Sequence, residues 1–145
     1  EKRKAFHSFY QDFYKDLTPP KPGVDGDEGS DEFEAKRKIY MDNKALRDEI
    51  EKDTRRTWPD LHFFCNLRGP EAEAEIHEDD DHYDGGNGIP GQNQLAITRV
   101  LFTFARLNPG IRYVQGMNEL LAPIYYVFKL DSMPDFSMEA EADSF

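Results

Sequence analysis

The chain has 145 residues and a formal net charge of −11 at pH 7; 38% of its residues are hydrophobic, 32% charged and 13% aromatic. This length suits one domain with a modest core. The charge argues against a general nucleic-acid-binding protein, because neutralising phosphates needs a basic face. The single cysteine, Cys65, rules out an internal disulfide and fits a reducing compartment. The sequence shows no secretory signal and no apolar run long enough to span a membrane.

The first predicted helix covers Ala5 to Leu17. Its apolar and aromatic residues recur at positions i, i+3, i+4 and i+7, which is the spacing of an amphipathic helix. These residues are Phe6, Phe9, Tyr10, Phe13, Tyr14 and Leu17. We expect this aromatic face to pack on the core. The proline-rich stretch from Thr18 to Gly23 ends the helix, and the acidic segment that continues to Asp31 predicts a loop.

Two further helices are predicted before residue 58. The first is short and runs from Phe33 to Asp42. Asn43 has the short polar side chain of an N-cap residue, so a second helix is expected to begin at Lys44. Trp58-Pro59 ends it, because the residue before a proline is pushed out of the helical region.

The second of these helices carries a candidate functional face. Ile50, Asp53 and Arg56 recur every three residues and therefore lie near one side of the helix. Arg56 is expected in the last turn, where its charge complements the helix dipole and its side chain can project beyond the helix end. An arginine at such a position is more often a simple capping or surface charge.

Residues 69–92 differ in composition from the rest of the chain, with many Gly, Pro, Glu and Asp and few apolar residues. This predicts a disordered acidic surface insertion. Gly86-x-Gly88-x-x-Gly91 matches a dinucleotide-binding string, but no strand precedes it. Asp80, His82 and Asp84 imitate half of a calcium loop, whose essential glutamate is replaced by Gly91. We therefore expect no cofactor or metal site in the insertion.

A helix is predicted from near Gln94 to the turn at Asn108. Its buried face should comprise Ile97, Val100, Leu101, Phe104 and Ala105.

The last well-defined helix is expected to begin at Met117. Its predicted buried face contains Met117, Leu120, Leu121, Ile124 and Phe128. Pro123 lies inside the pattern and predicts a kink. Gln115 then lies at the entrance of this helix, where a glutamine usually caps its neighbours. Because no segment alternates in the manner of a strand, the expected fold is all-α.

The two candidate polar residues lie in longer motifs. Ile50-x-x-Asp53-x-x-Arg56 is followed by Thr57, and the sequence YVQGMNEL runs from Tyr113 to Leu120. These resemble the two signature motifs of the TBC domain, the Rab GTPase-activating family. Either motif alone would be weak, but the two in the correct order are specific.

The resemblance covers about Asp42 to Phe145, with the acidic insertion as a gap. It implies the N-terminal part of a multi-helical all-α domain with long acidic loops, so residues 1–145 are expected to be a partial domain that is truncated at the C-terminus. Within it, residues 33–68 form the arginine-finger helices and residues 93–130 the glutamine-finger helices. The insertion and the segment from Ala140 to Phe145 also indicate one subgroup of the family.

By resemblance, Arg56 is the arginine finger and Gln115 the glutamine finger of a GTPase activator, which has no independent reaction of its own. The residues expected to support them are Ile50, Asp53, Tyr113, Gly116 and Asn118. The implied partner is a Rab GTPase in the GTP state, which carries the GTP and Mg²⁺, so this chain needs no cofactor. A cytoplasmic protein recruited to endomembranes through its partner is expected, whereas binding to nucleic acid is not.

Two alternatives remain open at this point. A noncatalytic Rab-binding scaffold would keep the fold and lose one finger, and the presence of both Arg56 and Gln115 argues against it. A truncated fragment of such a domain would carry both fingers and yet be inactive.

Overall fold

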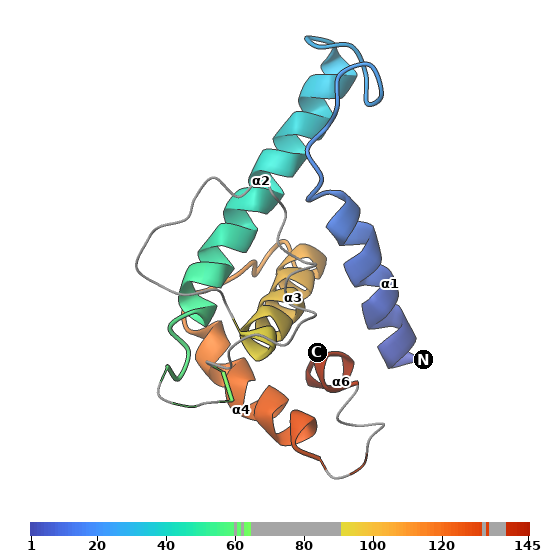
Figure 1. Ribbon diagram of the computed structural model, residues 1–145. Coiled ribbons are helices and arrows are strands. Elements are labelled where there is room, and N and C mark those ends of the chain that lie inside the picture. The colour runs from blue at the N-terminus through green and yellow to red at the C-terminus, as the bar shows by residue number, and fades with distance from the viewer. Residues whose placement is uncertain (60, 62, 65–90, 132, 134–138) are drawn as a thin grey trace.

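The computed structural model describes residues 1–59, 61, 63–64, 91–131, 133 and 139–145 (Figure 1). In these residues it contains α-helices and no strand, which confirms the all-α prediction. The helices are α1 (Lys2–Lys15), α2 (Asp31–Thr54), α3 (Gln92–Leu107), α4 (Met117–Lys129) and α6 (Ala140–Ser144). None of the described helices is long and apolar enough to cross a bilayer.

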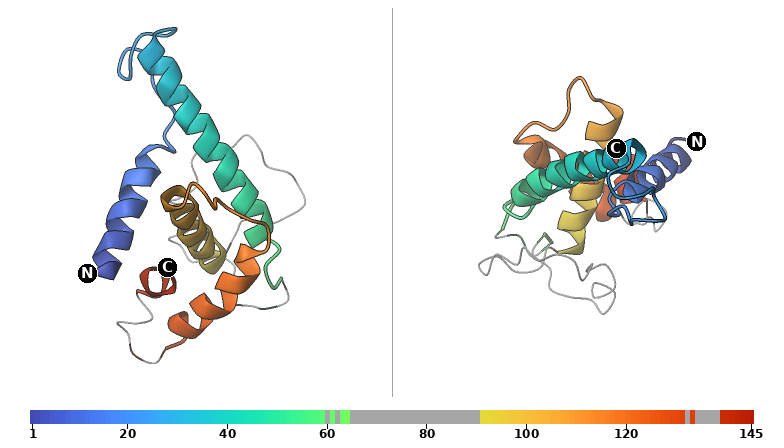
Figure 2. Two further views of the ribbon diagram at one scale, coloured as in Figure 1. Left: turned by 180° about the vertical axis from the view of Figure 1, so that it is seen from behind. Right: turned by 90° about the horizontal axis from the view of Figure 1, so that it is seen from above.

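Helix α3 lies at the centre and packs against the other four described helices (Figures 1 and 2). The face predicted for it is confirmed at four positions and only partly buried at Phe104. Those four residues are Ile97, Val100, Leu101 and Ala105. The helix starts two residues earlier than expected, because Gly91 and Gln92, assigned to the insertion, form its N-cap and first turn. The remaining positions of the insertion and Cys65 lie outside the described residues.

Helix α2 is one continuous helix, so the predicted break at Asn43 is wrong. Its N-cap is Ser30, whose hydroxyl accepts a hydrogen bond from the backbone N–H of Phe33 (3.2 Å). Asn43 is buried in the middle of the helix, and its Oδ1 accepts a hydrogen bond from Arg106 Nη1 (2.5 Å). The asparagine side chain is therefore used in a contact with α3 and does not cap a helix end. The first turns of α2 project away from the other helices (Figures 1 and 2).

Helix α1 is less buried than its sequence predicts. Phe6 is fully buried and Phe13 packs partly on the core, but Phe9 and Tyr14 are exposed. The guanidinium of Arg106 lies over the Phe13 ring, 4.8 Å from its centroid, and also pairs with Asp16 (2.7 Å). Since Arg106 also holds Asn43, this one side chain joins α1, α2 and α3.

Helix α4 buries a face one residue out of register with the predicted one. Leu121 and Tyr125 are buried, together with Asn118 and Ala122, whereas Leu120 is 72% exposed. The predicted positions Met117 and Phe128 are partly buried, and Ile124 is exposed. The helix is apolar on almost every side, so periodicity could not select the face that points to the core. The rotation of α4 about its axis is instead determined by Asn118, whose hydrogen bonds are described below. The helix continues through Pro123, and a kink there stays a prediction.

Helix α6 holds the C-terminal end of the chain against α1 and α3. Ala140 and Ala142 are buried in the core. Arg3 forms a two-bond ion pair with Asp143 (2.6 and 2.7 Å), and Arg99 forms one with Glu141 (2.7 and 2.9 Å). Paired arginine forks of this kind give geometric specificity as well as attraction.

Two neighbouring leucines of α4 test its rotation. In the chain of residues 1–145 we expect Leu121→Ala to lower the free energy of unfolding by about 2–5 kcal/mol, because it empties a core position. The same change at the exposed Leu120 should cost less than about 0.5 kcal/mol. Urea unfolding followed by circular dichroism measures both, and equal losses would contradict the register described here.

Candidate functional site

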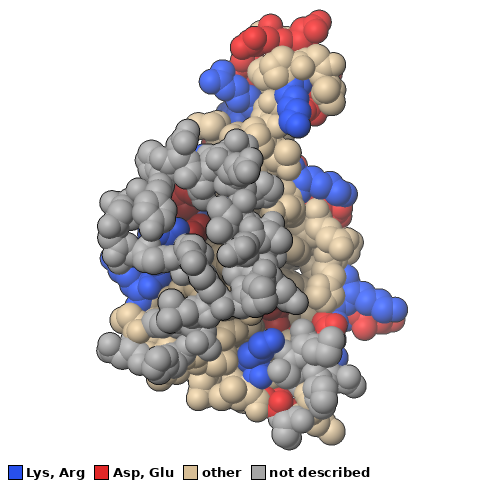
Figure 3. Space-filling model, viewed as in Figure 1, with Lys and Arg blue, Asp and Glu red and all other residues tan. Residues whose placement is uncertain are grey.

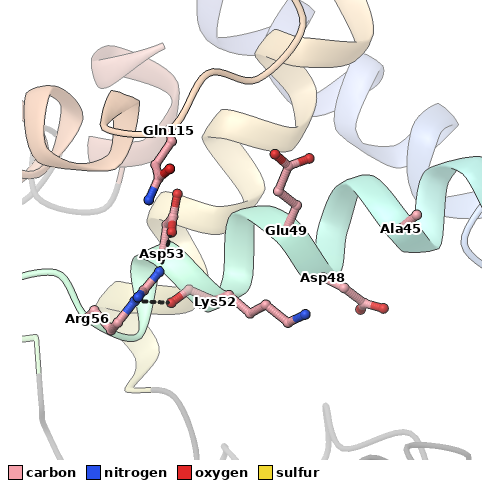
Figure 4. A pocket seen from close by; sticks show the side chains of 7 residues that line it. All are labelled: Ala45, Asp48, Glu49, Lys52, Asp53, Arg56 and Gln115. Carbon is pink, nitrogen blue, oxygen red and sulfur yellow. Dashed lines mark hydrogen bonds and ion pairs between the residues drawn. The ribbon is translucent and has the colours of Figure 1, made fainter.

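The arginine of the first motif stands just beyond the end of α2. The helix ends at Thr54, so Arg56 lies past the last turn in which it was predicted, and its backbone N–H bonds to the carbonyl oxygen of Asp53 (3.1 Å). The Arg56 side chain is 68% exposed. Its Nη2 donates to Asp53 Oδ1 (2.7 Å) and its Nε to the carbonyl oxygen of Lys52 (3.2 Å), as Figure 4 shows. Arg56 is therefore anchored along one edge and open on the other.

The end of α2 is also fixed from the side of α3. Gln94, in the first turn of α3, is buried and donates from Nε2 to the carbonyl oxygen of Arg55 (3.3 Å). Its Oε1 accepts the backbone N–H of Gly91 (3.0 Å). One side chain thus satisfies a free carbonyl at one helix end and a free N–H at another.

The glutamine of the second motif lies at the entrance of α4, as predicted. Gln115 is exposed, Gly116 is the N-cap residue and the helix begins at Met117. Gly116 has φ +99°, a left-handed conformation that a residue with a side chain adopts only with strain. A Cβ built there would meet no neighbouring atom within 4 Å, so backbone conformation, and not crowding, requires glycine.

One carboxylate joins the two motifs. While Oδ1 of Asp53 holds Arg56, its Oδ2 accepts a hydrogen bond from the Tyr113 hydroxyl (2.8 Å). Burial, followed by the bond to Asp53, raises the pKa of Tyr113 above its ordinary value of 10.0. The phenol consequently remains protonated and able to donate at physiological pH.

Asn118 and Thr57 complete this buried network. Asn118 Nδ2 donates to Thr57 Oγ1 (2.8 Å) and to the Asp53 carbonyl oxygen (3.2 Å). The Thr57 hydroxyl donates to the same carbonyl oxygen (3.2 Å). Both side chains are almost fully buried, so the bonds hold the start of α4 against the end of α2 in a dry environment.

Arg56 and Gln115 border a single open hollow with a volume of about 430 Å³ (Figure 4). The residues that line it are Ala45, Asp48, Glu49, Lys52, Asp53, Arg56 and Gln115. Of the other residues expected in the site, Tyr113 and Asn118 lie in the network behind it. Ile50 is fully buried in the core, where it anchors α2.

Thr57 belongs to the first motif but was not predicted to support the site, and Glu49 was not singled out at all. Thr57 lies four residues after Asp53, and this helical spacing together with its polar side chain was the available signal. Glu49 lies four residues before Asp53, but exposed acidic residues are frequent on α2 and nothing in the pattern distinguished it. In the part of the chain that the structure describes, no cluster of three or more His, Cys, Asp or Glu side chains could hold a metal ion.

Comparison with known proteins defines the class to which this fold and site belong. Residues 25–145 match the Rab-GTPase-TBC domain, and the chain is a member of that family. Its relatives include TBC1 domain family member 13 of mouse and of human, each 53% identical over 148 aligned positions that cover 73% of this chain. The acidic insertion and the C-terminal segment predicted the subgroup typified by this relative, and the comparison confirms that prediction.

A more distant relative is the GTPase-activating protein GYP7 of Candida glabrata, which is 30% identical over 88% of this chain. The chain spans 36% of the length of the mouse and human relatives and 15% of the yeast one. No solved structure matches it significantly.

The buried network can be tested with two tyrosines. We expect Tyr113→Phe to lower the free energy of unfolding by about 1–3 kcal/mol, because a carboxylate oxygen of Asp53 loses its donor in a buried place. Because the pKa of Tyr113 is raised in the folded protein, this contribution is complete below pH 10 and is lost as the pH rises beyond it.

The matched control is Tyr126→Phe. Tyr126 is half-buried against Phe63, and its hydroxyl has no hydrogen bond among the described residues, so the change should stay within about 0.5 kcal/mol. Urea unfolding at pH 7 and at pH 11 compares the two variants. Equal effects at pH 7 would contradict the role of the Tyr113 hydroxyl.

Proposed function

We propose that this chain carries the catalytic face of a GTPase-activating protein for Rab-family small GTPases. Arg56 and Gln115 would enter the partner's nucleotide site in trans and stimulate GTP hydrolysis. The observation that carries the proposal is that these two side chains, 59 positions apart in the sequence, border one hollow. Asp53 joins the two motifs behind them, because it binds Arg56 through one carboxylate oxygen and Tyr113 through the other. Membership of the Rab-GTPase-TBC family supports it, as does the similarity to the GTPase-activating protein GYP7.

The geometry of Arg56 suits the charge that develops in phosphoryl transfer. A guanidinium has five N–H donors in a planar fork, and Arg56 uses one on Nε and one on Nη2 to hold its position. The three that remain can face the oxygens of the γ-phosphoryl group. A lysine has one point charge and cannot be anchored and donate in this planar manner.

Gln115 suits the second requirement, which is to orient the attacking water. Its carboxamide accepts a hydrogen bond through oxygen and donates through nitrogen without itself titrating. In GTPases a residue of this type positions the water in line with the leaving group. The exposed position of Gln115 on a short turn before α4 lets it reach a partner surface.

The partner completes the site. The Rab in its GTP state would bring the nucleotide and Mg²⁺, so no cofactor of this chain is required. Supporting roles follow from the contacts: Asp53 holds the rotamer of Arg56, Tyr113 and Asn118 set the position of the Gln115 turn, and Gly116 permits its backbone conformation. We further propose that the protein works in the cytoplasm at endomembranes in vesicle trafficking, to which its Rab would recruit it.

Single-turnover GTP hydrolysis across a panel of purified Rabs tests the proposal, with the protein at its natural length. Arg56→Ala should lower the stimulated rate by about 10³-fold to 10⁵-fold, as removal of an arginine finger does elsewhere. Arg56→Lys should restore little, and Gln115→Ala should also be severe. Arg37→Ala, an exposed arginine of α2 outside the hollow, is the matched control and should remain active.

The outcomes separate the alternatives. Stimulation that survives both Arg56→Ala and Gln115→Ala at unchanged melting temperature would overturn the site assignment. A GTP-loaded Rab that binds without faster hydrolysis would favour the noncatalytic scaffold. Absence of both binding and stimulation across the panel would contradict the proposed function.

A further inference from the structure

The hollow extends along α2 beyond the two finger residues. Glu49 lies one helical turn before Asp53, is exposed and lines the hollow. Figure 4 shows its side chain on the side of α2 that faces Gln115, while Lys52 points elsewhere. Its charge reaches the Tyr113 hydroxyl, whose pKa it helps to raise. Glu49 is therefore part of the wall of the candidate site.

Among the residues that the structure describes, Glu49 differs from the other glutamates of the same helix because its carboxylate forms no ion pair. Glu32, Glu34 and Glu51 each form an ion pair with a basic residue three or four positions later. Lys52 occupies the corresponding place after Glu49, yet no ion pair or hydrogen bond of the Glu49 carboxylate occurs within the described residues. A carboxylate that these residues leave without a partner is available to a partner molecule.

The proposed function restricts what that partner group can be. If the triphosphate of a GTPase approaches Arg56 and Gln115, a free carboxylate two turns of helix or less away meets the rim of the same nucleotide site. The phosphates would repel the Glu49 carboxylate at this rim unless a cation on the GTPase lies opposite the carboxylate. The complementary group is therefore a basic side chain.

Ala45 supplies the room for such a side chain. It lies one turn before Glu49, is exposed and lines the far end of the hollow. Lysine and arginine place their methylene stems along apolar surface while the charged end reaches a polar group. The methyl group of Ala45 followed by the carboxylate of Glu49 fits this arrangement.

We propose, on the basis of the proposed function, that Glu49 and Ala45 form a specificity surface that selects GTPases with a Lys or Arg at the rim of their nucleotide site. Glu49 acts on binding and orientation, and the chemical step belongs to Arg56 and Gln115. Its charge should therefore affect KM and the salt dependence of activation more than kcat.

The test compares Glu49→Gln and Glu49→Lys with the unaltered protein at its natural length, on the panel of purified Rabs. On the best substrate at low salt, Glu49→Gln should lower kcat/KM by roughly two- to tenfold, mainly through KM, and Glu49→Lys should lower it further. The differences should shrink as salt is raised, because exposed charges are screened. A Lys→Glu or Arg→Glu change at the rim of that Rab should restore activation by the Glu49→Lys variant.

Glu34→Gln and Glu34→Lys are the matched controls. Glu34 is exposed in the first turn of α2, outside the hollow, where Figure 3 shows acidic and basic side chains together on the projecting end. These variants change the net charge equally and should leave kcat/KM as it is. If the Glu49 and Glu34 variants behave alike on every Rab, the inference is overturned.

The Arg56→Ala variant is measured in parallel, because it distinguishes failure of the Glu49 inference from failure of the proposed function. Loss of activation in Arg56→Ala together with unchanged Glu49 variants would overturn the specificity surface alone. An unaltered protein that activates no Rab would overturn both.

Discussion

The candidate site depends on the contacts of one group, the carboxylate of Asp53. Its two oxygens bind different motifs, Arg56 through one and Tyr113 through the other. Asp53 is 8% exposed, and a buried carboxylate without partners would be costly. The structure therefore favours the arrangement in which the end of α2 and the entrance of α4 stay together, which also determines how far apart Arg56 and Gln115 lie.

The remaining architecture supports that contact. Helix α3 packs on both α2 and α4, and its Gln94 binds the carbonyl oxygen of Arg55, which precedes Arg56. Thr54 and Thr98 share a buried hydrogen bond of 2.9 Å that joins α2 to α3. With its base held in this way, Arg56 keeps one edge of its guanidinium anchored and the other exposed. This order is what the proposed contact with a GTPase would require.

Sequence patterns predicted the helices well where one face was clearly apolar. Helix α3 has such a face, and four of its five predicted residues are buried, but the helix lies at the centre of the fold and buries further positions such as Ala96 and Phe102 that the pattern did not indicate. Helix α4 is apolar nearly all round, and its inner face was predicted one residue out of register, because the hydrogen bonds of Asn118 decide its rotation. Asn43 was predicted to cap a helix, since nothing local reveals that Arg106, 63 positions later, binds it inside α2.

The sequence by itself determined the helical class, because periodicity is local. Its two motifs, through their resemblance to the TBC signatures, identified Arg56 and Gln115 as the candidate pair. Tertiary structure decided that both motifs converge on Asp53, that Thr57 belongs to the network behind them and that Glu49 lines the hollow. Those facts depend on which surfaces of α2 and α4 meet, and contacts between residues about 60 positions apart leave no periodic signal in the chain.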